Sequence, residues 1–193
     1  MPSILKSETH CSFPQSQVSD SIRYSQVRAL LPSDSQHLWR LEEGLVRTYS
    51  WNEQGDITIL GIWGPGDIVG QSLSNVTPYR IQSLGTVKVQ PVNLKHWLTA
   101  EVILEYAQQL TLLLKIVSIR RADDRLLSLL KWLAERFGRV TPTGIFTALP
   151  ITHQELAETA NITRVTATRL IGELEQRGIL KWSRCQHFEL LNS

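Results

Sequence analysis

The sequence predicts an α+β chain in which an antiparallel β-roll is followed by one long helix and a small C-terminal domain of helices and strands. Short alternating runs of apolar and polar residues, broken by glycine-containing turns, come first. A sustained helical period follows, and a pair of helices with two strand-like runs ends the chain. We therefore divide the chain into a lead-in, a β-roll, a long helix and a C-terminal domain, at residues 1–30, 31–93, 94–121 and 122–193.

Composition and charge narrow the possible functions. The 193 residues suffice for one large domain or two small ones, and 42% apolar with 20% charged residues is typical of a globular protein. The 20 basic and 18 acidic residues leave a net charge of +2, which is too small to predict nucleic-acid binding from bulk charge. Cys11 and Cys185 lie far apart, and neither has a second cysteine at metal-ligand spacing, so we expect no disulfide framework and no zinc site.

No segment has the composition of a membrane span or of an export signal. A span needs about eighteen uninterrupted apolar residues. No such run occurs, and the first residues lack a long apolar core. We expect a cytoplasmic protein with no membrane partner.

The β-roll is predicted by short strands and frequent turns. Residues 1–30 are rich in serine, glutamine and threonine without a sustained period, so we expect a mobile or loosely packed lead-in there. The strand pattern is clear from Leu38 and stops near Pro91. Within it, residues 52–56 (NEQGD) and 64–67 (GPGD) are typical of tight turns. This pattern indicates a jelly-roll or a small barrel.

Residues 94–121 have the pattern of a long dimerisation helix. Spacings of three and four residues align five side chains on one seam: Ile103, Tyr106, Leu110, Leu113 and Val117. A second apolar face includes Leu112, Leu114 and Ile116. We expect a homodimer through the seam, with another face free to pack on the β-roll. A single buried helix in a monomer is the alternative.

The C-terminal domain is expected to begin with a helix and a loop. Asp123 or Asp124 can cap that helix, Gly138 can end it, and residues 139–150 are predicted to be a loop. A capping box then follows, in which the hydroxyl of Thr152 accepts from the backbone of the residue three positions later and a glutamate side chain reaches back. The box predicts a short helix that starts after Thr152.

This short helix, the turn at Asn161 and the helix after Thr163 have the layout of a helix-turn-helix. Asn161 stands where a positive φ is expected, and Thr163 can cap the second helix. Apolar or small side chains occupy the positions where two steeply crossing helices meet, namely Leu156, Ala157, Ile162, Ala167 and Leu170.

Five residues of the second helix stay outside this contact: Arg164, Val165, Thr166, Thr168 and Arg169. The helix carries no carboxylate before Glu173, so we expect both arginines to be unpaired. Arginine binds guanine O6 and N7 in a two-pronged contact, and an exposed valine or threonine methyl suits a thymine methyl. The face therefore predicts base reading in double-stranded DNA, and a bundle with solvated arginines is the alternative.

The last residues predict a wing beside the helix-turn-helix. Residues 179–191 have the pattern of two short strands around a polar turn. Arg184 at the tip is expected to contact phosphate, and so are the donors at the start of the first helix, Thr152, His153 and Gln154. Cys185 is a solitary thiol, which we expect to be inert rather than redox-sensitive.

With a β-roll, a long helix and a winged helix-turn-helix in this order, the chain resembles the CRP/FNR family of transcription regulators from Leu38 onward. The resemblance rests on LWRLEEGLVRTY, GDITIL and GPGDIVGQ in the roll and on LPITHQELAETANITRVTATRLIGELEQRGIL near the C-terminus. Within the family, TRVTATRLIGEL is similar to the nitrogen-control (NtcA-type) branch. The resemblance implies a roll like a cyclic-nucleotide-binding domain, a homodimer on a palindrome with GTA and TAC half-sites, and, for an activator, RNA polymerase as a partner.

The roll departs from the family members that bind cyclic nucleotides. Those members present a glycine-glutamate pair for the ribose and an arginine-serine pair for the phosphate, whereas here Gln71 replaces the glutamate and Thr77 and Pro78 replace the second pair. A cyclic phosphate needs a fixed cation or several backbone donors, so we expect no cAMP binding. The candidate effector residues that remain are Val69, Gly70, Gln71, Ser72 and Arg80. The resemblance to the nitrogen-control branch implies a 2-oxoglutarate site, for which Val69, Gly70 and Arg80 are the candidates.

An enzyme is disfavoured by the sequence. A metal in the cup of a jelly-roll needs a histidine pair with a carboxylate, and no histidine lies between His37 and His96. The cysteines of an iron-sulfur sensor and the ligand pair of a haem sensor are missing, so we expect no cofactor and no metal. We predict a regulator that binds DNA without gating by cAMP. The alternative is a DNA-binding regulator whose β-roll docks a protein and has no small-molecule effector.

Overall fold

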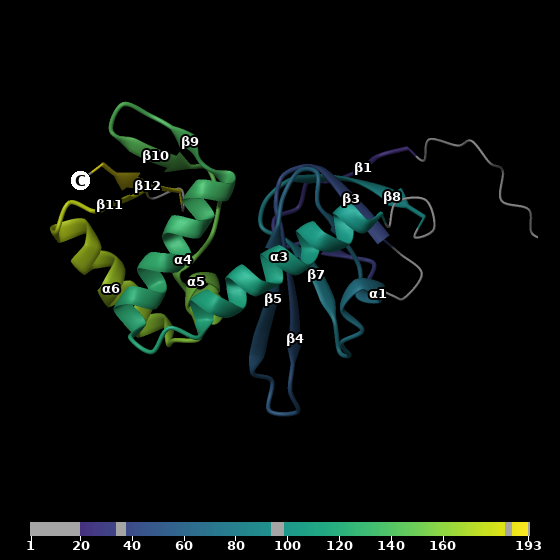
Figure 1. Ribbon diagram of the computed structural model, residues 1–193, viewed down its shortest axis with the longest axis horizontal. Helices are drawn as coiled ribbons and strands as arrows, with labels where there is room; N and C mark the ends of the chain where they lie inside the picture. The colour runs from purple at the N-terminus through teal and green to yellow at the C-terminus, as the bar shows by residue number, and fades with distance from the viewer. Residues whose placement is uncertain (1–19, 34–37, 94–98, 184–186, 193) are drawn as a thin grey trace, which may run out of the picture.

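The computed structural model describes residues 20–33, 38–93, 99–183 and 187–192, which form a β-roll and a C-terminal domain (Figure 1). A long helix, α3 (Ala100–Val117), runs along the roll toward the C-terminal domain. Among these residues, no helix is long and apolar enough to cross a membrane. The predicted α+β class is confirmed.

Two antiparallel four-stranded sheets form the β-roll, with the orders β1-β8-β3-β6 and β2-β7-β4-β5. The strands of the first sheet are β1 (Ile22–Tyr24), β8 (Val87–Val92), β3 (Leu38–Glu43) and β6 (Ile68–Val69). Those of the second sheet are β2 (Leu30–Leu31), β7 (Arg80–Ser83), β4 (Val46–Trp51) and β5 (Ile57–Trp63). Because most neighbouring strands are not consecutive in sequence, the chain crosses repeatedly between the sheets.

The alternation along the strands sends one set of side chains into the space between the sheets. In β4, Val46 and Thr48 are fully buried, whereas Tyr49 and Trp51 are partly exposed. The indole N–H of Trp63 donates to the Thr48 hydroxyl at 2.9 Å. This hydrogen bond pairs two buried polar groups of the core with each other, as burial requires.

Both predicted turns are present. In the hairpin between β4 and β5, the N–H of Asn52 donates to the Asp56 carbonyl (3.2 Å), and the Asp56 N–H donates to Asn52 Oδ1 (2.9 Å). In the turn before β6, the Asp67 N–H donates to the Gly64 carbonyl (3.0 Å), and the Asp67 carboxylate accepts from the Gly64 N–H (2.7 Å). Gly66 in this turn has φ 95°, a conformation that favours glycine.

The predicted lead-in over residues 1–30 is wrong for residues 20–30. Strand β1 pairs with β8, and β2 begins at Leu30 and pairs with β7. Strands of two and three residues are too short to display a period, so the sequence pattern could not reveal them. Residues 1–19 lie outside the described residues.

The helices after the roll differ in detail from the prediction. A single turn, α1 (Gln71–Ser74), follows β6, and α3 starts after Thr99, whose hydroxyl accepts from the Val102 N–H at 3.3 Å. Residues 94–98 of the predicted helix are not among the described ones, and the helix ends at Val117 rather than at residue 121.

Helix α4 (Ala122–Phe137) opens the C-terminal domain and ends at Gly138, as predicted. Arg121 occupies the N-cap position, and no side chain caps the helix. The expectation that Asp123 or Asp124 caps it is wrong, because both lie inside the first turn. There their negative charges face the positive end of the helix dipole.

A four-stranded sheet of order β11-β12-β10-β9 covers α4. Its strands are β9 (Arg139–Val140), β10 (Gly144–Thr147), β11 (Leu180–Trp182) and β12 (Phe188–Leu191). The prediction of a plain loop over residues 139–150 is therefore wrong, whereas the two strands of the wing are confirmed. A Cβ at Gly144 would lie 1.8 Å from the Leu190 carbonyl oxygen, so glycine allows β10 and β12 to pair closely.

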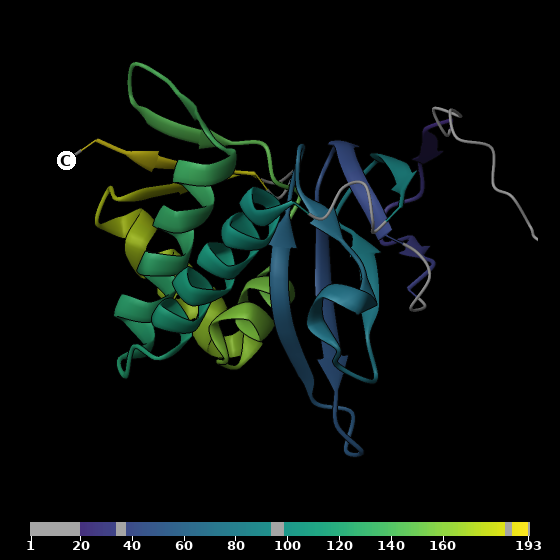
Figure 2. The same cartoon turned by 45° about the vertical axis from the view of Figure 1, so that its right-hand side comes forward.

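The helix-turn-helix consists of α5 (His153–Ala160) and α6 (Arg164–Gln176). Both α3 and α5 contact β5, so they lie between the roll and the rest of the C-terminal domain (Figure 2). Buried side chains from both parts form one hydrophobic cluster, which includes Ile62, Leu84, Leu113, Leu129, Leu133, Leu156 and Ile171. The roll and the helix-turn-helix are thus packed together through a shared core.

Candidate nucleic-acid interface

The capping box fixes the start of α5. The Thr152 hydroxyl accepts from the Glu155 N–H at 3.1 Å, and Glu155 Oε2 accepts from the Thr152 N–H at 2.8 Å. This prediction is confirmed. The first-turn N–H groups of a helix lack intrahelical acceptors, so this end of α5 attracts anions. Next to it, Gln154 is exposed and its amide donates to Glu158 at 2.9 Å.

The turn between α5 and α6 has the expected geometry. Asn161 adopts the left-handed conformation with φ 50°, and its N–H bonds back to α5. The Thr163 hydroxyl caps α6 by accepting from the Thr166 N–H at 3.2 Å. Small and apolar residues join the two helices, as predicted: Leu156, Ala157, Ala167 and Leu170 are buried, and Ile162 is partly buried.

Four of the five predicted base-reading residues are exposed on one side of α6, and we call them the recognition face: Arg164, Val165, Thr168 and Arg169. Val165 is 80% exposed, so its side chain is available for contact with a partner. Thr166 differs from the other four because it is partly buried and its hydroxyl lies 2.9 Å from that of Thr163. The recognition face thus combines two cations with apolar methyl groups.

The expectation that both arginines are unpaired is wrong for Arg169. Its guanidinium bonds to Glu173, one turn later on the same side of α6. A spacing of four residues brings two side chains together on a helix surface. Both side chains are largely exposed, so the pair contributes little to stability and leaves Arg169 able to exchange partners.

His153, predicted to contact phosphate, turns its ring toward α6 and the wing. Its Nδ1 atom lies 3.0 Å from the Thr168 hydroxyl, and its ring meets Trp182 edge-on with centroids 4.9 Å apart. Burial, followed by the charge of Arg164, lowers the pKa of His153 below its usual 6.5. These residues and their neighbours line a cavity of about 400 Å³ at the start of α5: Thr152, His153, Gln154, Arg164 and Trp182.

The wing packs through its aromatic residues. Trp182 of β11 stacks on Phe188 of β12 with centroids 5.9 Å apart and ring planes 6° from parallel. Arg184 and Cys185, which the sequence places at the tip, lie outside the described residues.

Two ion pairs that sequence reasoning missed connect α5 to the roll. Arg28 Nε lies 2.6 Å from Glu155 Oε1, and Arg47 Nη1 lies 2.5 Å from Glu158 Oε2. Arg28 also donates to the carbonyl of Pro150 at 3.0 Å, just before α5. No local pattern could have revealed these contacts, because more than 100 residues separate the partners in both pairs.

The predicted dimer seam on α3 is on the wrong side of the helix. Leu113 is buried in the shared core and Val117 packs against it, while Tyr106 and Leu110 pack against the core of the roll. The Tyr106 ring stacks on Trp63 with centroids 4.7 Å apart. Of the five seam residues, only Ile103 is exposed, at 50%. The seam therefore serves the fold of one chain.

A neighbouring face of α3, about 100° around the helix from the seam, carries the two most exposed leucines of the helix. Leu104 and Leu114 are 58% and 65% exposed. Ala107 and Thr111 lie between them, also exposed, at alternating spacings of three and four residues. We call Leu104, Ala107, Thr111 and Leu114 the outer stripe of α3. This stripe has the spacing that pairs helices, and nothing in the described part of the chain covers it.

The predicted effector residues do not converge on one site. Val69 and Gly70 are buried in the roll, and the Gln71 amide donates to the Thr77 hydroxyl at 3.0 Å. The Arg80 guanidinium lies over the Trp51 ring, 5.2 Å from its centroid. Ser72 is exposed on α1.

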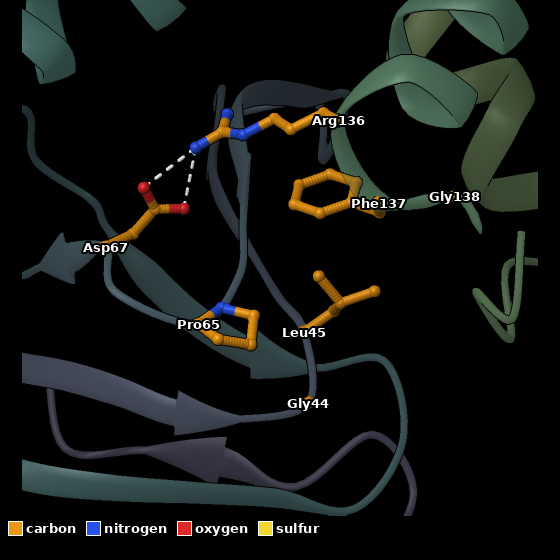
Figure 3. A pocket seen from close by; sticks show the side chains of 7 residues that line it. All are labelled: Gly44, Leu45, Pro65, Asp67, Arg136, Phe137 and Gly138. Carbon is orange, nitrogen blue, oxygen red and sulfur yellow. Dashed lines mark hydrogen bonds and ion pairs between the residues drawn. The ribbon is translucent and has the colours of Figure 1, made fainter. Parts of the chain in front are cut away.

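A cavity of about 490 Å³ lies instead between the roll and the end of α4 (Figure 3). Arg136 reaches across from α4, and its Nη2 donates to both carboxylate oxygens of Asp67 at 2.8 and 2.6 Å. Burial raises the pKa of Asp67 and lowers that of Arg136, while their mutual attraction opposes both shifts. The lining residues are Gly44, Leu45, Pro65, Asp67, Arg136, Phe137 and Gly138, so none of the predicted effector residues contributes.

No group of three or more histidine, cysteine, aspartate or glutamate side chains that could hold a metal ion occurs among residues 20–33, 38–93, 99–183 and 187–192.

Comparison with known sequences gives matches over the C-terminal domain and over most of the chain. Residues 124–193 match the Crp-like helix-turn-helix domain. The regulatory protein CysR of Synechococcus elongatus is 40% identical over 154 residues, which are 78% of this chain and 75% of that protein. The global nitrogen regulator of the same organism is 36% identical over 72 residues, 37% of this chain and 32% of that protein.

Solved structures share the fold at low sequence identity. A CRP-family transcriptional regulator from Thermus thermophilus superposes with a TM-score of 0.70 at 20% identity, covering 89% of this chain and 92% of that chain. FixK2 from Bradyrhizobium japonicum gives a TM-score of 0.72 at 16% identity, with 91% and 94% coverage. Because both superpositions cover about nine-tenths of this chain, the shared fold extends over the roll, the long helix and the helix-turn-helix.

Proposed function

The chain belongs to the CRP/FNR family of transcription regulators, and we propose that it binds a palindromic DNA site as a homodimer and reads bases with the recognition face of α6. The observation that carries this proposal is the exposure of Arg164, Val165, Thr168 and Arg169 above a buried helix-turn-helix frame. Two cations and an exposed valine on one face match the acceptors and methyl groups at the edges of base pairs.

The chemistry of the face suggests which bases it reads. Arg164 has no carboxylate partner among the described residues, and Arg169 has only an exposed one, so both can bind guanine or phosphate. Val165 has no polar side-chain atom and suits a thymine methyl. Half-sites of the GTA and TAC kind contain both bases. The likeness to the global nitrogen regulator of Synechococcus elongatus supports the same choice.

Phosphate contacts would orient the protein on the duplex. The first turn of α5, with exposed Gln154 beside it, offers backbone donors at the positive end of a helix dipole. Thr152 engages both its hydroxyl and its backbone N–H with Glu155, so the structure favours His153 and Gln154 over Thr152 as phosphate donors. The His153 ring uses Nδ1 for Thr168 and buries Nε2, so the contribution of His153 would come through its backbone N–H. Arg184 remains a proposed phosphate contact of the wing.

The outer stripe of α3 is the proposed dimer interface, in place of the predicted seam. Leu104 and Leu114 are the largest exposed apolar residues with the required spacing. A two-fold axis along α3 would relate the two helix-turn-helix units. On DNA, the two copies of α6 would then enter successive major grooves about 34 Å apart.

We also propose that cAMP does not gate the protein. Gln71 uses its amide to bind Thr77, and Arg80 lies over Trp51 rather than at a phosphate position. RNA polymerase is the proposed further partner, and the cytoplasm, where chromosomal DNA lies, is the proposed location. The protein itself would catalyse no reaction.

Selection from randomised DNA tests the central proposal. The expected result is a two-fold symmetric site, and purified wild-type protein should bind it far more tightly than a scrambled duplex. Adding cAMP or cGMP should leave this affinity unchanged. Recovered sites without symmetry, or micromolar binding of either cyclic nucleotide by calorimetry, would contradict the corresponding part of the proposal.

A further inference from the structure

The His153 ring lies where three elements of the C-terminal domain meet. His153 is the first residue of α5, and its ring contacts Thr168 of α6 and Trp182 of β11. The capping box fixes the backbone at this point, because Thr152 and Glu155 bond to each other in both directions. The ring therefore has a fixed position relative to the recognition face.

The hydroxyl of Thr168 is directed toward this ring. In a helix, a threonine hydroxyl commonly donates to a carbonyl of the preceding turn. Within the described part of the chain, His153 is instead the only hydrogen-bond partner of the Thr168 hydroxyl, at 3.0 Å. The Cβ of threonine carries one hydroxyl and one methyl group. With the hydroxyl turned toward His153, the methyl is the group left for the exposed side of Thr168.

The surroundings keep the imidazole neutral near pH 7. Burial and the nearby Arg164 lower the pKa of His153, and Glu175, the other charged group facing it, opposes them more weakly. A neutral imidazole has one nitrogen that can accept a hydrogen bond. Its Nε2 atom is buried without a partner among the described residues, so Nδ1 carries the only hydrogen bond that the ring makes.

We propose that His153 is a positioning residue that sets the base preference of α6 through Thr168. By holding the hydroxyl inward, it makes the Thr168 methyl the group that meets the base edge. At the base pair that Thr168 contacts, the protein would then prefer thymine for its methyl group, and not a base that offers a hydrogen bond. This inference rests on the proposed function, since its ligand is the duplex that α6 reads.

Selection from DNA randomised at the base pairs under α6 provides the test, with the full chain and substitutions at both positions. Thr168→Val keeps a methyl and loses the hydroxyl, so the thymine preference should persist. Thr168→Ser keeps the hydroxyl and loses the methyl, so the preference should fall about fourfold, the effect of one buried methyl group. His153→Ala frees the hydroxyl to turn outward and should lower the preference at the same base pair by a similar factor.

The double variant His153→Ala/Thr168→Val separates positioning from a general loss of structure. Valine has no hydroxyl to turn outward, so the thymine preference should return. Thr159→Val is the matched control, because it removes a buried hydrogen bond within α5 (2.7 Å to the Glu155 carbonyl) without touching His153. It should lower stability and leave base preference unchanged.

Two results would overturn the inference: equal weakening of all sites by His153→Ala, or no recovery in the double variant. If the wild-type protein selects no site at all, the failure lies with the proposed function and not with the role of His153.

Discussion

Replacing two leucines of the outer stripe, Leu104→Glu with Leu114→Glu, should convert the dimer into folded monomers. The two side chains are 58% and 65% exposed in one chain, so neither supports the fold of that chain. Burying such a fraction of a leucine contributes about 1–2 kcal/mol. A two-fold interface through the outer stripe would contain four such leucines, so the dimer should lose about 4–8 kcal/mol, which weakens its dissociation constant about a thousandfold or more. The desolvation of the new carboxylates adds to this loss.

Sedimentation velocity at micromolar concentration measures the outcome directly. The wild-type protein should sediment as a dimer, and the double variant as a monomer with an unchanged circular dichroism spectrum. Leu104→Ala with Leu114→Ala should weaken the dimer less, because it adds no charge. The matched comparison is Leu113→Glu, which buries a carboxylate in the shared core and should unfold the chain. A double glutamate variant that stays dimeric at micromolar concentration would refute the assignment of the outer stripe.

Four further predictions concern the DNA contacts, the ion pair between the roll and the C-terminal domain, and the effect of pH on stability. Arg164→Ala should weaken binding to the selected site by about 1–3 kcal/mol and binding to scrambled DNA by less, as measured by fluorescence anisotropy. Equal losses of affinity for both duplexes would mean that Arg164 contacts phosphate and not a base. Val165→Glu should shift the selected base pair toward G·C, since a carboxylate accepts from cytosine N4; an unchanged preference would exclude Val165 as a base contact. Arg28→Ala leaves the Glu155 carboxylate, which is only 5% exposed, without its cation. This change should lower the free energy of unfolding by about 2 kcal/mol in urea titrations, and Arg28→Lys should lower it by less. Because the pKa of His153 is lower in the folded state than in the unfolded state, protonation of this ring opposes folding. The free energy of unfolding should therefore decrease as the pH falls below 6.5, and His153→Gln should remove that part of the decrease.

The helix-turn-helix could be predicted from the sequence in detail because local chemistry determines it. The capping box uses residues three positions apart, Asn161 takes the positive φ that its short polar side chain tolerates, and Thr163 caps the next helix. Each of these signals involves fewer than five consecutive residues. The exposed recognition face then follows from helical geometry alone.

The contacts between distant segments could not be predicted in this way. Arg28 lies in a stretch whose strands are too short to show a period, and its partner Glu155 has an adequate local role in the capping box. Nothing near either residue requires a second partner. The hairpin of β9 and β10 was missed for a related reason, because β9 has two residues and gains its order from pairing with β10.

Helix α3 shows that a helical period does not tell which apolar face packs within the chain and which is free for a partner. Both the predicted seam and the outer stripe repeat at three and four residues, so spacing assigns neither to a partner. The assignment depends on which side chain has a matching surface within the chain. Tyr106 is decisive, because its ring stacks on Trp63 and burial raises its pKa to about 12. Because this large aromatic ring packs on the β-roll, its side of α3 is occupied within the chain, and the exposed leucines beside it are the ones that we propose for contact with a second copy.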